Sequence, residues 1–525
     1  MFESSPLRNA PFRLFYFGSI GTALGYTMQA TIAAWLMATL TPSALMVALV
    51  QTASTAPSLL FGLIAGALAD IVDRRRVILS TQIMLVVGTI CVGLATLTGI
   101  IGPVSLLIFT FLIGTGFTFY LPAQQASINE LVARSELSTA VALGAVAYNV
   151  ARALGPALAG AIAAWMGTGS GFLVSAAFFT LMIAALYKVK PREPALPGVP
   201  ERLMAGVMSG IRYARHSPSM RSLIIRNLSF STCASAFWAL LPVIARDQLA
   251  LGAGGFGLLS AAFGIGAIAG ALTLPRQLQG RSLNSVVNAG VMIWSVSILL
   301  VAATSTTPVA LIGACGAGVA WVTVLASLSA GTQSTAPAWV RARALAVNLV
   351  GSQASLALGS AVWGMVASYA GTRVALAVSV AVVLALLLIN RNVRVQLGSD
   401  ADTTPGAQLP EIGIASEPLP DDGPVLIQIE YQIDAAQREP FLRALADIGP
   451  TRRRNGATSW RVFRDLGEEG RFVERFIISS WAEYVRLRTR RTMTDSQLQD
   501  RVYSMQREGV PVRVSRLIGI DPQSH

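Results

Sequence analysis

The chain is poor in charged residues, in cysteine and in histidine. Of its 525 residues only 13% are charged and 53% are hydrophobic, proportions that exclude a single soluble domain of this length. The cysteines Cys91, Cys233 and Cys315 fall in apolar runs at unrelated spacings, so no disulfide framework is expected. Because the only histidines are His216 and His525 and the cysteines do not cluster, a zinc site lacks ligands, and no metal or other cofactor is expected.

Negative charge is also scarce along most of the chain. The net charge of +13 arises in residues 1–399, because residues 400–525 hold slightly more acidic than basic residues. Basic residues in the loops between apolar runs suit a protein surrounded by anionic lipid. The expected partner is therefore the lipid bilayer and not a nucleic acid.

Long apolar runs dominate the sequence. Runs of about 20 residues, the length that crosses a hydrocarbon core of about 30 Å, can be drawn twelve times, which predicts an all-α membrane body. The first run is long enough to span and lacks a small-residue cleavage site, so it is not expected to be a signal peptide. The predicted spans are 14–38, 43–69, 77–99, 103–127, 138–164, 170–188, 222–245, 254–275, 284–304, 308–330, 341–367 and 372–390.

The loop charges predict the orientation of these spans. Loops on one side carry nearly all of the arginines and lysines, whereas those on the other side carry only Arg246 and Arg373. By the positive-inside rule, we expect a multi-pass protein of the inner (cell) membrane with both termini in the cytoplasm.

Glycines recur at one constant spacing between the two parts of the apolar region. This repeat predicts two six-helix bundles, 1–190 and 222–395. The paired positions are Gly62 with Gly266, Gly66 with Gly270, Gly114 with Gly318, Gly155 with Gly359, and Gly160 with Gly364.

Residues 191–221 form a basic cytoplasmic loop between the predicted bundles. Its second part places apolar residues on one helical face, which predicts either a helix on the inner leaflet or a plain linker. The apolar positions are Leu203, Val207, Met208, Ile211 and Ala214, and Arg202, Arg212 and Arg215 fall elsewhere.

The character of the chain changes after residue 395. Residues 396–424 are acidic and rich in proline, which predicts an extended tether. Residues 425–525 then alternate strand and helix patterns in the order βαββαβ, which is typical of a ferredoxin-like α+β domain. The predicted strands are 425–431, 458–465, 471–479 and 510–518, and the predicted helices are 435–447, 481–491 and 495–507.

A short polar stretch separates the second and third spans. Gly66 and Asp70 lie one helical turn apart on one face, and an arginine run follows. Small residues allow helices to approach closely, and a carboxylate at a helix end can pair differently in two conformations. We therefore predict a conformational latch, although arginines that only obey the charge rule are the simpler alternative. The latch residues are Gly66, Asp70, Asp73, Arg74, Arg75 and Arg76.

This stretch resembles the loop between helices 2 and 3 of the major facilitator superfamily, with Asp73 where many members have glycine. Other segments are similar to the secretion-effector branch, which contains the enterobactin exporter: Leu121–Ala126, Asn129–Val132, Gly155–Gly160 and Trp339–Arg343. The resemblance covers about residues 8–391. The C-terminal region resembles the dimeric α/β-barrel modules related to antibiotic-biosynthesis monooxygenases.

Arg152 is the clearest ionisable residue deep within a predicted span. An intramembrane charge is costly, so it should face a cavity or a partner. It either attracts an anionic or polyhydroxylated substrate, or it has a structural role in which it binds backbone carbonyls freed by Pro156 or pairs with a polar neighbour. The segment resembles the helix-5 signature of superfamily antiporters, with Ala151 and Ala159 in place of glycines, which implies a hinge at Gly155, Pro156 and Gly160.

Other polar residues at depth are candidates for the same substrate cavity, although such residues also hold helices together. The predicted cavity comprises Arg152, Asn149, Tyr148, Tyr26, Gln29, Gln125 and Gln353. Tryptophans that could line it for an aromatic substrate are Trp35, Trp238, Trp294, Trp321 and Trp363.

The resemblance implies a secondary exporter of a small molecule, such as a siderophore-like or other secondary metabolite. Proton coupling is expected from the resemblance alone, because the middle of the predicted cavity helices holds no aspartate or glutamate. The alternatives are a broad drug-efflux pump and a membrane-anchored monooxygenase-like enzyme or sensor. For the C-terminal domain we expect a role in dimerisation or regulation rather than in catalysis. Catalysis would need polar residues to converge on one pocket, and the candidates are Asn455, Trp460, Trp481, Glu483 and Tyr484.

Overall fold

The computed structural model describes residues 6–133, 136–188, 203–337, 339–390, 404 and 418–520, and a few side chains inside these ranges, including that of Asp70, are not described. The chain divides into two compact units. Unit 1 comprises Met1–Gly198, Arg226–Leu328 and Leu349–Asn392. Unit 2 comprises Val199–Ile225, Ser329–Asn348 and Val393–His525. Unit 1 thus holds helices from both predicted bundles. Most of the predicted tether at 396–424 lies outside the described residues.

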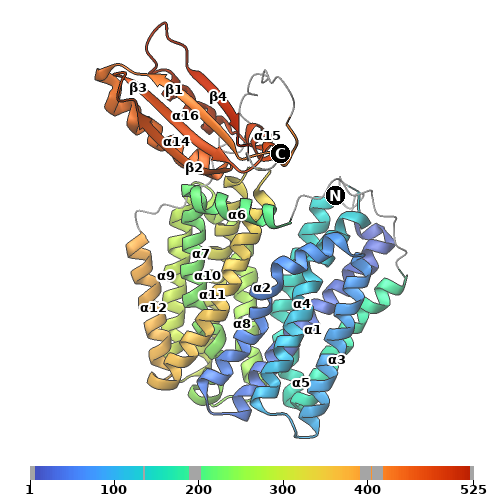
Figure 1. The fold of residues 1–525 in the computed structure, drawn as a ribbon. Coiled ribbons are helices and arrows are strands. Elements are labelled where there is room, and N and C mark those ends of the chain that lie inside the picture. Colours follow the sequence, from blue (N-terminus) through green and yellow to red (C-terminus); the bar gives the residue numbers. More distant parts are fainter. Residues whose placement is uncertain are drawn as a thin grey trace. The chain divides into compact units, whose positions relative to one another are not determined.

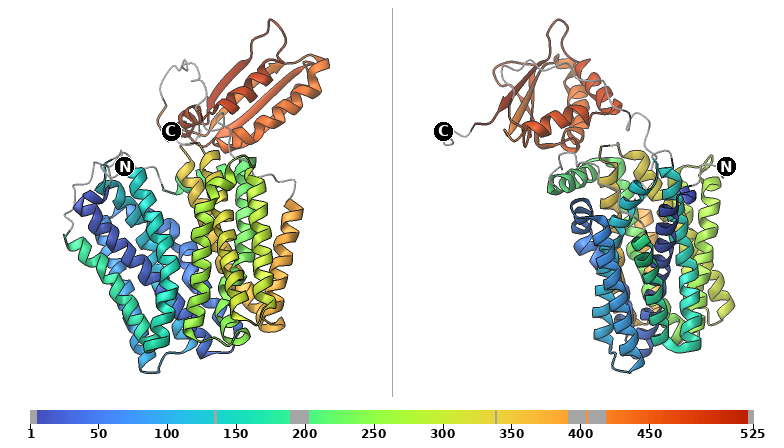
Figure 2. Two further views of the ribbon diagram at one scale, coloured as in Figure 1. Left: turned by 180° about the vertical axis from the view of Figure 1, so that it is seen from behind. Right: turned by 90° about the vertical axis from the view of Figure 1, so that its right-hand side faces the viewer.

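Long apolar helices build unit 1 (Figures 1 and 2). Among the described residues, ten helices are long and apolar enough to cross a membrane; α1 is not one of them. Most of these helices agree with the predicted spans to within a few residues at each end. The helices are α1 (Ala10–Leu40), α2 (Ala44–Ile71), α3 (Arg74–Leu97), α4 (Pro103–Leu131), α5 (Leu137–Lys188), α7 (Pro218–Val243), α8 (Ala253–Leu278), α9 (Leu283–Ala303), α10 (Thr307–Thr335), α11 (Arg341–Ala370) and α12 (Thr372–Ile389).

Helix α5 unites two predicted spans. It has 52 residues, which at 1.5 Å per residue would make a straight rod of about 78 Å, far more than a bilayer core needs. The rod is interrupted at Gly167, whose φ of 83° and ψ of 164° are not helical. Because a positive φ is easily adopted only by glycine, one residue replaces the loop that we predicted between 164 and 170.

Side chains cap the helices that follow polar gaps. The Ser43 hydroxyl accepts a hydrogen bond from the Met46 N–H at 3.4 Å, and the Asp73 carboxylate accepts one from the Arg75 N–H at 2.8 Å. Such caps satisfy backbone donors that have no partner in the first helical turn. The caps therefore fix where α2 and α3 begin.

Helix α5 occupies a central position in unit 1. It packs along α1 and α3 of the first predicted bundle and along α8 of the second. The pair α2 and α4 and the pair α9 and α12 form further contacts within each bundle. Helices α5 and α8 therefore form one contact between the bundles, and α2 and α11 form another, in which the Thr52 hydroxyl donates to the Ala357 carbonyl at 2.8 Å.

The C-terminal part of unit 2 is a four-stranded antiparallel sheet in the order β2-β3-β1-β4. Alternate residues of β1 are buried, and the buried face packs on α14 and α16 (Figure 1). The predicted order of strands and helices is confirmed. The elements are β1 (Val425–Gln432), α14 (Arg438–Arg454), β2 (Ala457–Arg464), β3 (Arg471–Ile478), α15 (Trp481–Thr489), α16 (Met493–Tyr503) and β4 (Arg513–Ile518).

Unit 2 also contains helix α6 (Leu203–His216), which the sequence predicted as amphipathic. Of the predicted apolar residues, Ala214 is buried and Met208 and Ile211 are about half exposed, which is compatible with an apolar face turned to lipid. Tyr213, which we did not assign, is also buried and packs against the turn between α10 and α11. The position of α6 on the inner leaflet stays a prediction.

Candidate functional site

Arg152 lies where the two predicted bundles meet. It projects from α5 of the first bundle, and its guanidinium carbon lies 5.8 Å from the ring centre of Trp238 and 5.9 Å from that of Trp321, both in the second bundle. A cation near aromatic faces is attracted by their quadrupoles. No carboxylate among the described residues forms an ion pair with Arg152, so its positive charge is available to an anion.

The two tryptophans belong to a larger aromatic cluster in the second bundle. Trp238 lies 4.5 Å from Phe263 and 5.9 Å from Trp321 between ring centres, and Trp294 lies 6.0 Å from Trp321. Edge-to-face packing of this kind holds large side chains in fixed positions. The aromatic cluster consists of Phe230, Phe237, Trp238, Phe263, Trp294 and Trp321.

Two of the five predicted cavity tryptophans lie outside this cluster. Trp35 stacks on Phe256 at 5.7 Å between ring centres, and the Trp363 indole N–H donates to the Thr232 carbonyl at 2.7 Å. Both rings thus contribute to packing between helices. The sequence identified the residue type but could not distinguish clustered tryptophans from scattered ones.

No described contact joins Tyr26, Gln29 or Gln125 to Arg152. Tyr26 stacks on Phe117 at 3.8 Å and its hydroxyl donates to the Ser54 carbonyl at 3.4 Å, both within the first bundle. Gln29 is buried, and its side-chain N–H2 group has no partner among the described residues. The side chains of Tyr148, Asn149 and Gln125 are exposed, and that of Gln353 is half-buried.

Helix α5 makes its closest contacts at the predicted hinge. A Cβ atom added at Gly155 would lie 2.1 Å from Thr27 Oγ1 of α1, and one added at Gly160 would lie 2.7 Å from the Gly257 Cα of α8. Neither Gly155 nor Gly160 has room for the methyl group of an alanine side chain. Gly155 therefore serves packing within the first bundle, whereas Gly160 brings the two bundles into backbone contact. Pro156 lies between them, and its carbonyl oxygen would be 2.8 Å from a Cβ at Gly257.

Hydrogen bonds join the bundles at the end of unit 1 that contains Arg246. The Arg246 guanidinium donates to the carbonyls of Ala38 and Thr41, the second at 2.9 Å. The Leu45 N–H of α2 donates to the Ser368 hydroxyl of α11 at 3.0 Å. We call this set the Arg246 seal: Ala38, Thr41, Leu45, Arg246 and Ser368.

The arginine run of the predicted latch makes one strong contact within the first bundle. Arg74 forms an ion pair with Glu130 of α4 and donates to the Ala126 carbonyl at 3.3 Å. Asp73 caps α3, and its carboxylate lies 4.0 Å from Arg76 Nε. Glu130 belongs to the segment Asn129–Val132 that resembles the secretion-effector branch, but the sequence did not identify it as the partner of an arginine.

No close helix contact at Gly66 is present among the described residues in this conformation. A Cβ added there would meet no atom of the described residues within 4 Å, whereas one at the matching Gly270 would lie 2.7 Å from the Val319 carbonyl oxygen. The two repeats therefore use the same glycine differently in this conformation. The side chain of Asp70 lies outside the described residues, so the latch itself stays a prediction.

A buried charge network lies inside the C-terminal sheet domain. Glu474 of β3 is fully buried and accepts hydrogen bonds from Tyr431 Oη at 2.9 Å, Trp460 Nε1 at 2.9 Å and Arg452 Nε at 3.0 Å. Burial by itself raises the pKa of Glu474, but the Arg452 charge and these hydrogen bonds hold the pKa below its usual range. In the sequence, Glu474 alternates with Phe472 and Phe476 on the inward face of the predicted strand, which could have indicated a buried charge. We did not predict a role for it.

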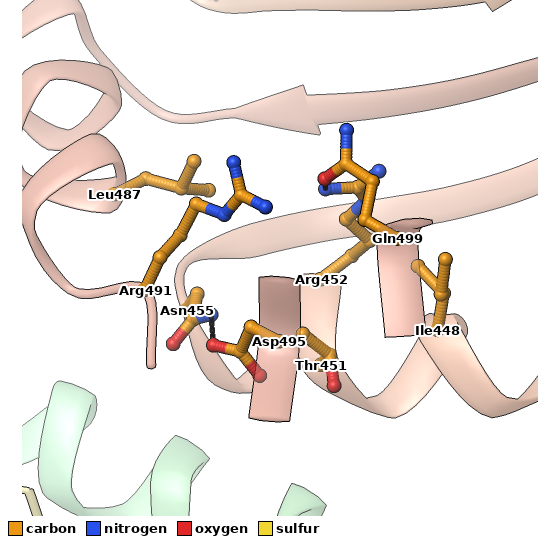
Figure 3. Close-up of a pocket in the computed structure, with 8 residues that line it drawn as sticks. All are labelled: Ile448, Thr451, Arg452, Asn455, Leu487, Arg491, Asp495 and Gln499. Carbon is orange, nitrogen blue, oxygen red and sulfur yellow. Dashed lines mark hydrogen bonds between the residues drawn. The ribbon is translucent and has the colours of Figure 1, made fainter. Parts of the chain in front are cut away.

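The cavity beside this network is too small for a metabolite. Its volume is about 10 Å³, room for about one water molecule. Asn455 donates to Asp495 at 3.0 Å within it (Figure 3). The lining residues are Ile448, Thr451, Arg452, Asn455, Leu487, Arg491, Asp495 and Gln499.

The residues expected of a catalytic C-terminal domain do not converge on this cavity. Asn455 lines it, Trp460 contacts Glu474, and Tyr484 accepts a hydrogen bond from Arg516 Nε at 2.6 Å. Trp481 packs on Tyr484 at 5.3 Å between ring centres, and Glu483 pairs with arginines. These residues serve separate contacts.

The outer face of the sheet carries a mixed surface. Leu426 of β1 is paired with Ile477 of β3 and with Leu517 of β4, and Leu517 is 54% exposed. An exposed apolar corner of this kind is compatible with a second copy of the domain. Dimerisation through this domain stays a prediction.

Comparison with known proteins adds a family assignment to this geometry. Residues 3–524 match the family described as transmembrane secretion effector. The multidrug efflux pump Tap of Mycolicibacterium fortuitum is 25% identical over 42% of this chain. The staphyloferrin A transporter of Staphylococcus aureus is 26% identical over 47% of it. The matched regions span 56% and 62% of these two relatives.

A third relative and a solved structure extend the comparison. The enterobactin exporter EntS of Citrobacter koseri is 28% identical over 59% of this chain and 71% of its own length. A bacterial homologue of the human lysosomal transporter Spinster, solved in an inward-facing and unoccupied conformation, superposes with a TM-score of 0.63 over 76% of this chain and 100% of its own. At 15% sequence identity, this likeness shows the fold alone.

Proposed function

Because the chain belongs to the transmembrane secretion effector family of the major facilitator superfamily, we propose that it is a secondary transporter that exports a small molecule by alternating access. In this proposal α1, the two parts of α5 on either side of Gly167 and the other long helices make twelve spans. The protein resides in the inner membrane with both termini in the cytoplasm, as the loop arginines indicate.

The observation that carries the proposal is the position of Arg152 between the bundles. A guanidinium that faces Trp238 and Trp321 across the bundle contact, without a carboxylate partner among the described residues, suits an anionic substrate with aromatic or hydroxylated groups. Siderophore-like and other secondary metabolites combine these features. The names of two relatives, a staphyloferrin A transporter and an enterobactin exporter, support this class of substrate.

The two states of the cycle differ at the ends of the bundles. With the Arg246 seal formed, the structure corresponds to a carrier closed on the outer side. In the opposite state the seal breaks, and the latch residues Gly66 and Asp70 meet the second bundle near the cytoplasm. Arg74 then remains tied to Glu130, so that the loop between α2 and α3 moves with α4.

The proposal is tested by the metabolites in spent medium. A deletion strain is complemented with the wild-type gene, Arg152→Ala or Arg152→Lys, and the medium is profiled by mass spectrometry. We expect Arg152→Ala to lower export of the affected metabolite by about ten- to 150-fold, the range set by one charge-assisted hydrogen bond to the substrate of about 1.5–3 kcal/mol. Arg152→Lys keeps the charge but loses the planar face and is expected to be intermediate.

Matched controls separate the alternatives. Gly144→Ala on the same helix, where an added Cβ meets no described atom, should complement fully. Full complementation by Arg152→Ala would contradict the proposed site. Deletion that leaves the medium unchanged but sensitises cells to many unrelated compounds would favour the drug-efflux alternative, which the relative named as a multidrug efflux pump supports. Unchanged export after the pH gradient is collapsed would remove proton coupling.

The C-terminal domain is, in this proposal, a ferredoxin-like module without catalysis. Its sheet order places β3 between β1 and β2, as the split βαβ unit requires. The enzyme alternative needs a substrate pocket, whereas the cavity beside Arg452 holds about 10 Å³. A role in regulation suits these features better.

A further inference from the structure

The turn between α1 and α2 leaves two backbone groups without partners in its own helices. The carbonyl of Ala38, in the last turn of α1, would normally accept a hydrogen bond from the N–H of residue 42. That residue is Pro42, which has no N–H to donate. The N–H of Leu45, in the first turn of α2, lies too near the helix start to have an acceptor within the helix.

The second bundle satisfies both groups. The Arg246 guanidinium donates through Nη1 to the carbonyls of Ala38 and Thr41. The Ser368 hydroxyl of α11 accepts the hydrogen bond from the Leu45 N–H at 3.0 Å. The cation also meets the negative end of the α1 dipole. When the bundles separate at this end, water can bind the same backbone groups, so the contacts can break without leaving a buried polar group unpaired.

Asp247 holds the other edge of the same guanidinium. Its carboxylate accepts hydrogen bonds from Arg246 Nε at 2.5 Å and from Arg246 Nη2 at 2.8 Å. Because a guanidinium is planar and rigid, a partner that binds one edge sets the direction in which the remaining N–H groups point. Asp247 thus directs Nη1 toward the carbonyls of the first bundle. Its own side chain is 53% exposed, so burial does not explain why a carboxylate stands here.

An unusual stretch of backbone carries this pair. Side chains of adjacent residues do not normally face each other on an α-helix. Here the chain forms a π-helical turn, η2 (Ile244–Gln248), and Ala250 then has a φ of 51°, a value that residues other than glycine seldom adopt. The Gln248 amide donates to the Val301 carbonyl of α9 at 2.8 Å, within the second bundle. The turn is therefore fixed to its own bundle, and Arg246 extends from it to the other.

Asp247 is also isolated in the sequence. Eight acidic residues precede residue 400, and the other seven lie before the first predicted span or at the ends of spans that the loop arginines assign to the cytoplasm. Asp247 alone lies at the opposite ends of the predicted spans, beside one of the two arginines found there. General loop composition therefore does not account for this carboxylate.

We propose that Asp247 is the positioning residue of an outer gate. It orients Arg246 of the second bundle to bind the C-terminal carbonyls of α1, and this contact stabilises the conformation in which the Arg246 seal is formed. Opening toward the outside separates the guanidinium from α1, while Asp247 keeps its hold on the other edge. This inference rests on the proposed alternating-access function and names the residues that set the balance between its two states.

Amide hydrogen exchange of the full-length protein in lipid nanodiscs tests the gate without a known substrate. Opening toward the outside should speed exchange of residues 38–48, which contain the turn between α1 and α2. It should also slow exchange of residues 71–80 at the start of α3, because the cytoplasmic end closes as the outer end opens. Local fraying of the outer turn would speed the first without slowing the second.

Arg246→Ala and Asp247→Asn are the gate variants. We expect Arg246→Ala to speed exchange of residues 38–48 by about tenfold, because charge-assisted hydrogen bonds to two carbonyls are lost. Exchange of residues 71–80 should slow by up to about twofold, the limit for a shift to equal populations of the two states. Asp247→Asn keeps the shape and loses the charge, and should speed exchange of residues 38–48 by about threefold. Asp247→Glu keeps the charge and should remain close to the unmodified protein.

Two comparisons separate positioning from other roles. Arg373→Ala removes the other arginine at this end, which donates to the Ser305 hydroxyl of its own bundle at 3.1 Å, and should change neither region. The double variant Arg246→Ala with Asp247→Asn should exchange like Arg246→Ala alone, because Asp247 then has no guanidinium to orient.

Three outcomes would overturn the inference. Unchanged exchange of residues 38–48 in Arg246→Ala would show that this contact does not hold the turn. A further increase in the double variant would show that Asp247 acts independently of Arg246. Faster exchange of residues 38–48 with unchanged exchange of residues 71–80 would show fraying and no gate.

Gly160→Ala distinguishes failure of the gate from failure of the proposed function, because its clash with Gly257 involves none of the gate residues. Opposite changes at the two ends in Gly160→Ala, without such changes in the gate variants, would remove the gate and keep alternating access. No opposite changes in any of these variants would remove alternating access itself.

Discussion

The contact between Gly160 of α5 and Gly257 of α8 provides a sharp test of the bundle interface. In Gly160→Ala the new methyl group would lie 2.7 Å from the Gly257 Cα and 2.9 Å from the Ala253 carbonyl oxygen. Both are backbone atoms, so the helices must separate. Such overpacking costs about 1–3 kcal/mol, and the better helix propensity of alanine offsets roughly 0.5–1 kcal/mol of it.

With the middle value of each range, a net cost of about 1.3 kcal/mol falls on the conformation in which α5 and α8 touch. Since 1.4 kcal/mol corresponds to a factor of ten, we expect its population relative to the other state to fall about tenfold. The distance between spin labels at Ile100→Cys of the first bundle and Tyr369→Cys of the second, two exposed positions, measures this change directly after Cys91, Cys233 and Cys315 are replaced by alanine. Export should change in the same variant, because the equilibrium between states sets the population that can turn over.

Two other glycines of α5 serve as controls for this substitution. Gly144→Ala adds a methyl group where no described atom lies within 4 Å and should leave the label distances unchanged. Gly155→Ala clashes with Thr27 of α1, within one bundle, and should lower thermal stability without favouring either state. If Gly160→Ala gave the same label distances as Gly144→Ala, the glycine contact would not restrain the bundles, and the reasoning would be refuted.

Two further predictions concern the charged pairs. Glu130→Arg alone should lower export, because it places a second cation opposite Arg74 where α3 and α4 meet. The charge-swapped double variant Glu130→Arg with Arg74→Glu should restore export. Failure of the double variant to restore export would argue against this ion pair. The pKa of Glu474 is held below its usual value of 4.5, so the unfolded chain binds more protons between these two pKa values, and the C-terminal domain should lose stability as the pH falls through 4.5 and below. Glu474→Gln should remove that part of the pH dependence and cost about 3–5 kcal/mol near neutral pH, because Arg452 is left without its partner. Hydrogen exchange of β3, corrected for the intrinsic pH effect, measures both, and an unchanged slope in Glu474→Gln would exclude Glu474 as the titrating group.

The sequence predicted the helices of the membrane body well because their signal is local. A run of apolar residues has one stable arrangement in a bilayer, and polar gaps such as the one containing Asp73 mark where helices begin. The alternating strand of residues 425–431 was equally readable, since every second side chain faces the core. Arg152 was identified because a charge inside an apolar span is conspicuous.

Contacts between distant segments were not readable in this way. The pairing of Arg152 with Trp238 and Trp321 joins three helices far apart in sequence, and no spacing rule connects them. Gly66 and Gly270 match in the repeat, yet only Gly270 packs on a neighbouring backbone in this conformation. A residue pattern gives the contacts that a glycine permits, whereas the conformation decides which of them form.

By itself the sequence determined that this protein crosses a membrane repeatedly and that an α+β domain follows its apolar part, because hydropathy, periodicity and charge are properties of neighbouring residues. Only the tertiary structure decided that Arg152 faces an aromatic cluster across the bundle contact, that Arg74 pairs with Glu130, and that Glu483 and Arg490 join the C-terminal domain to α6 and Trp339. These pairings depend on how separate elements pack, and packing energies are set by shape and burial over the whole fold.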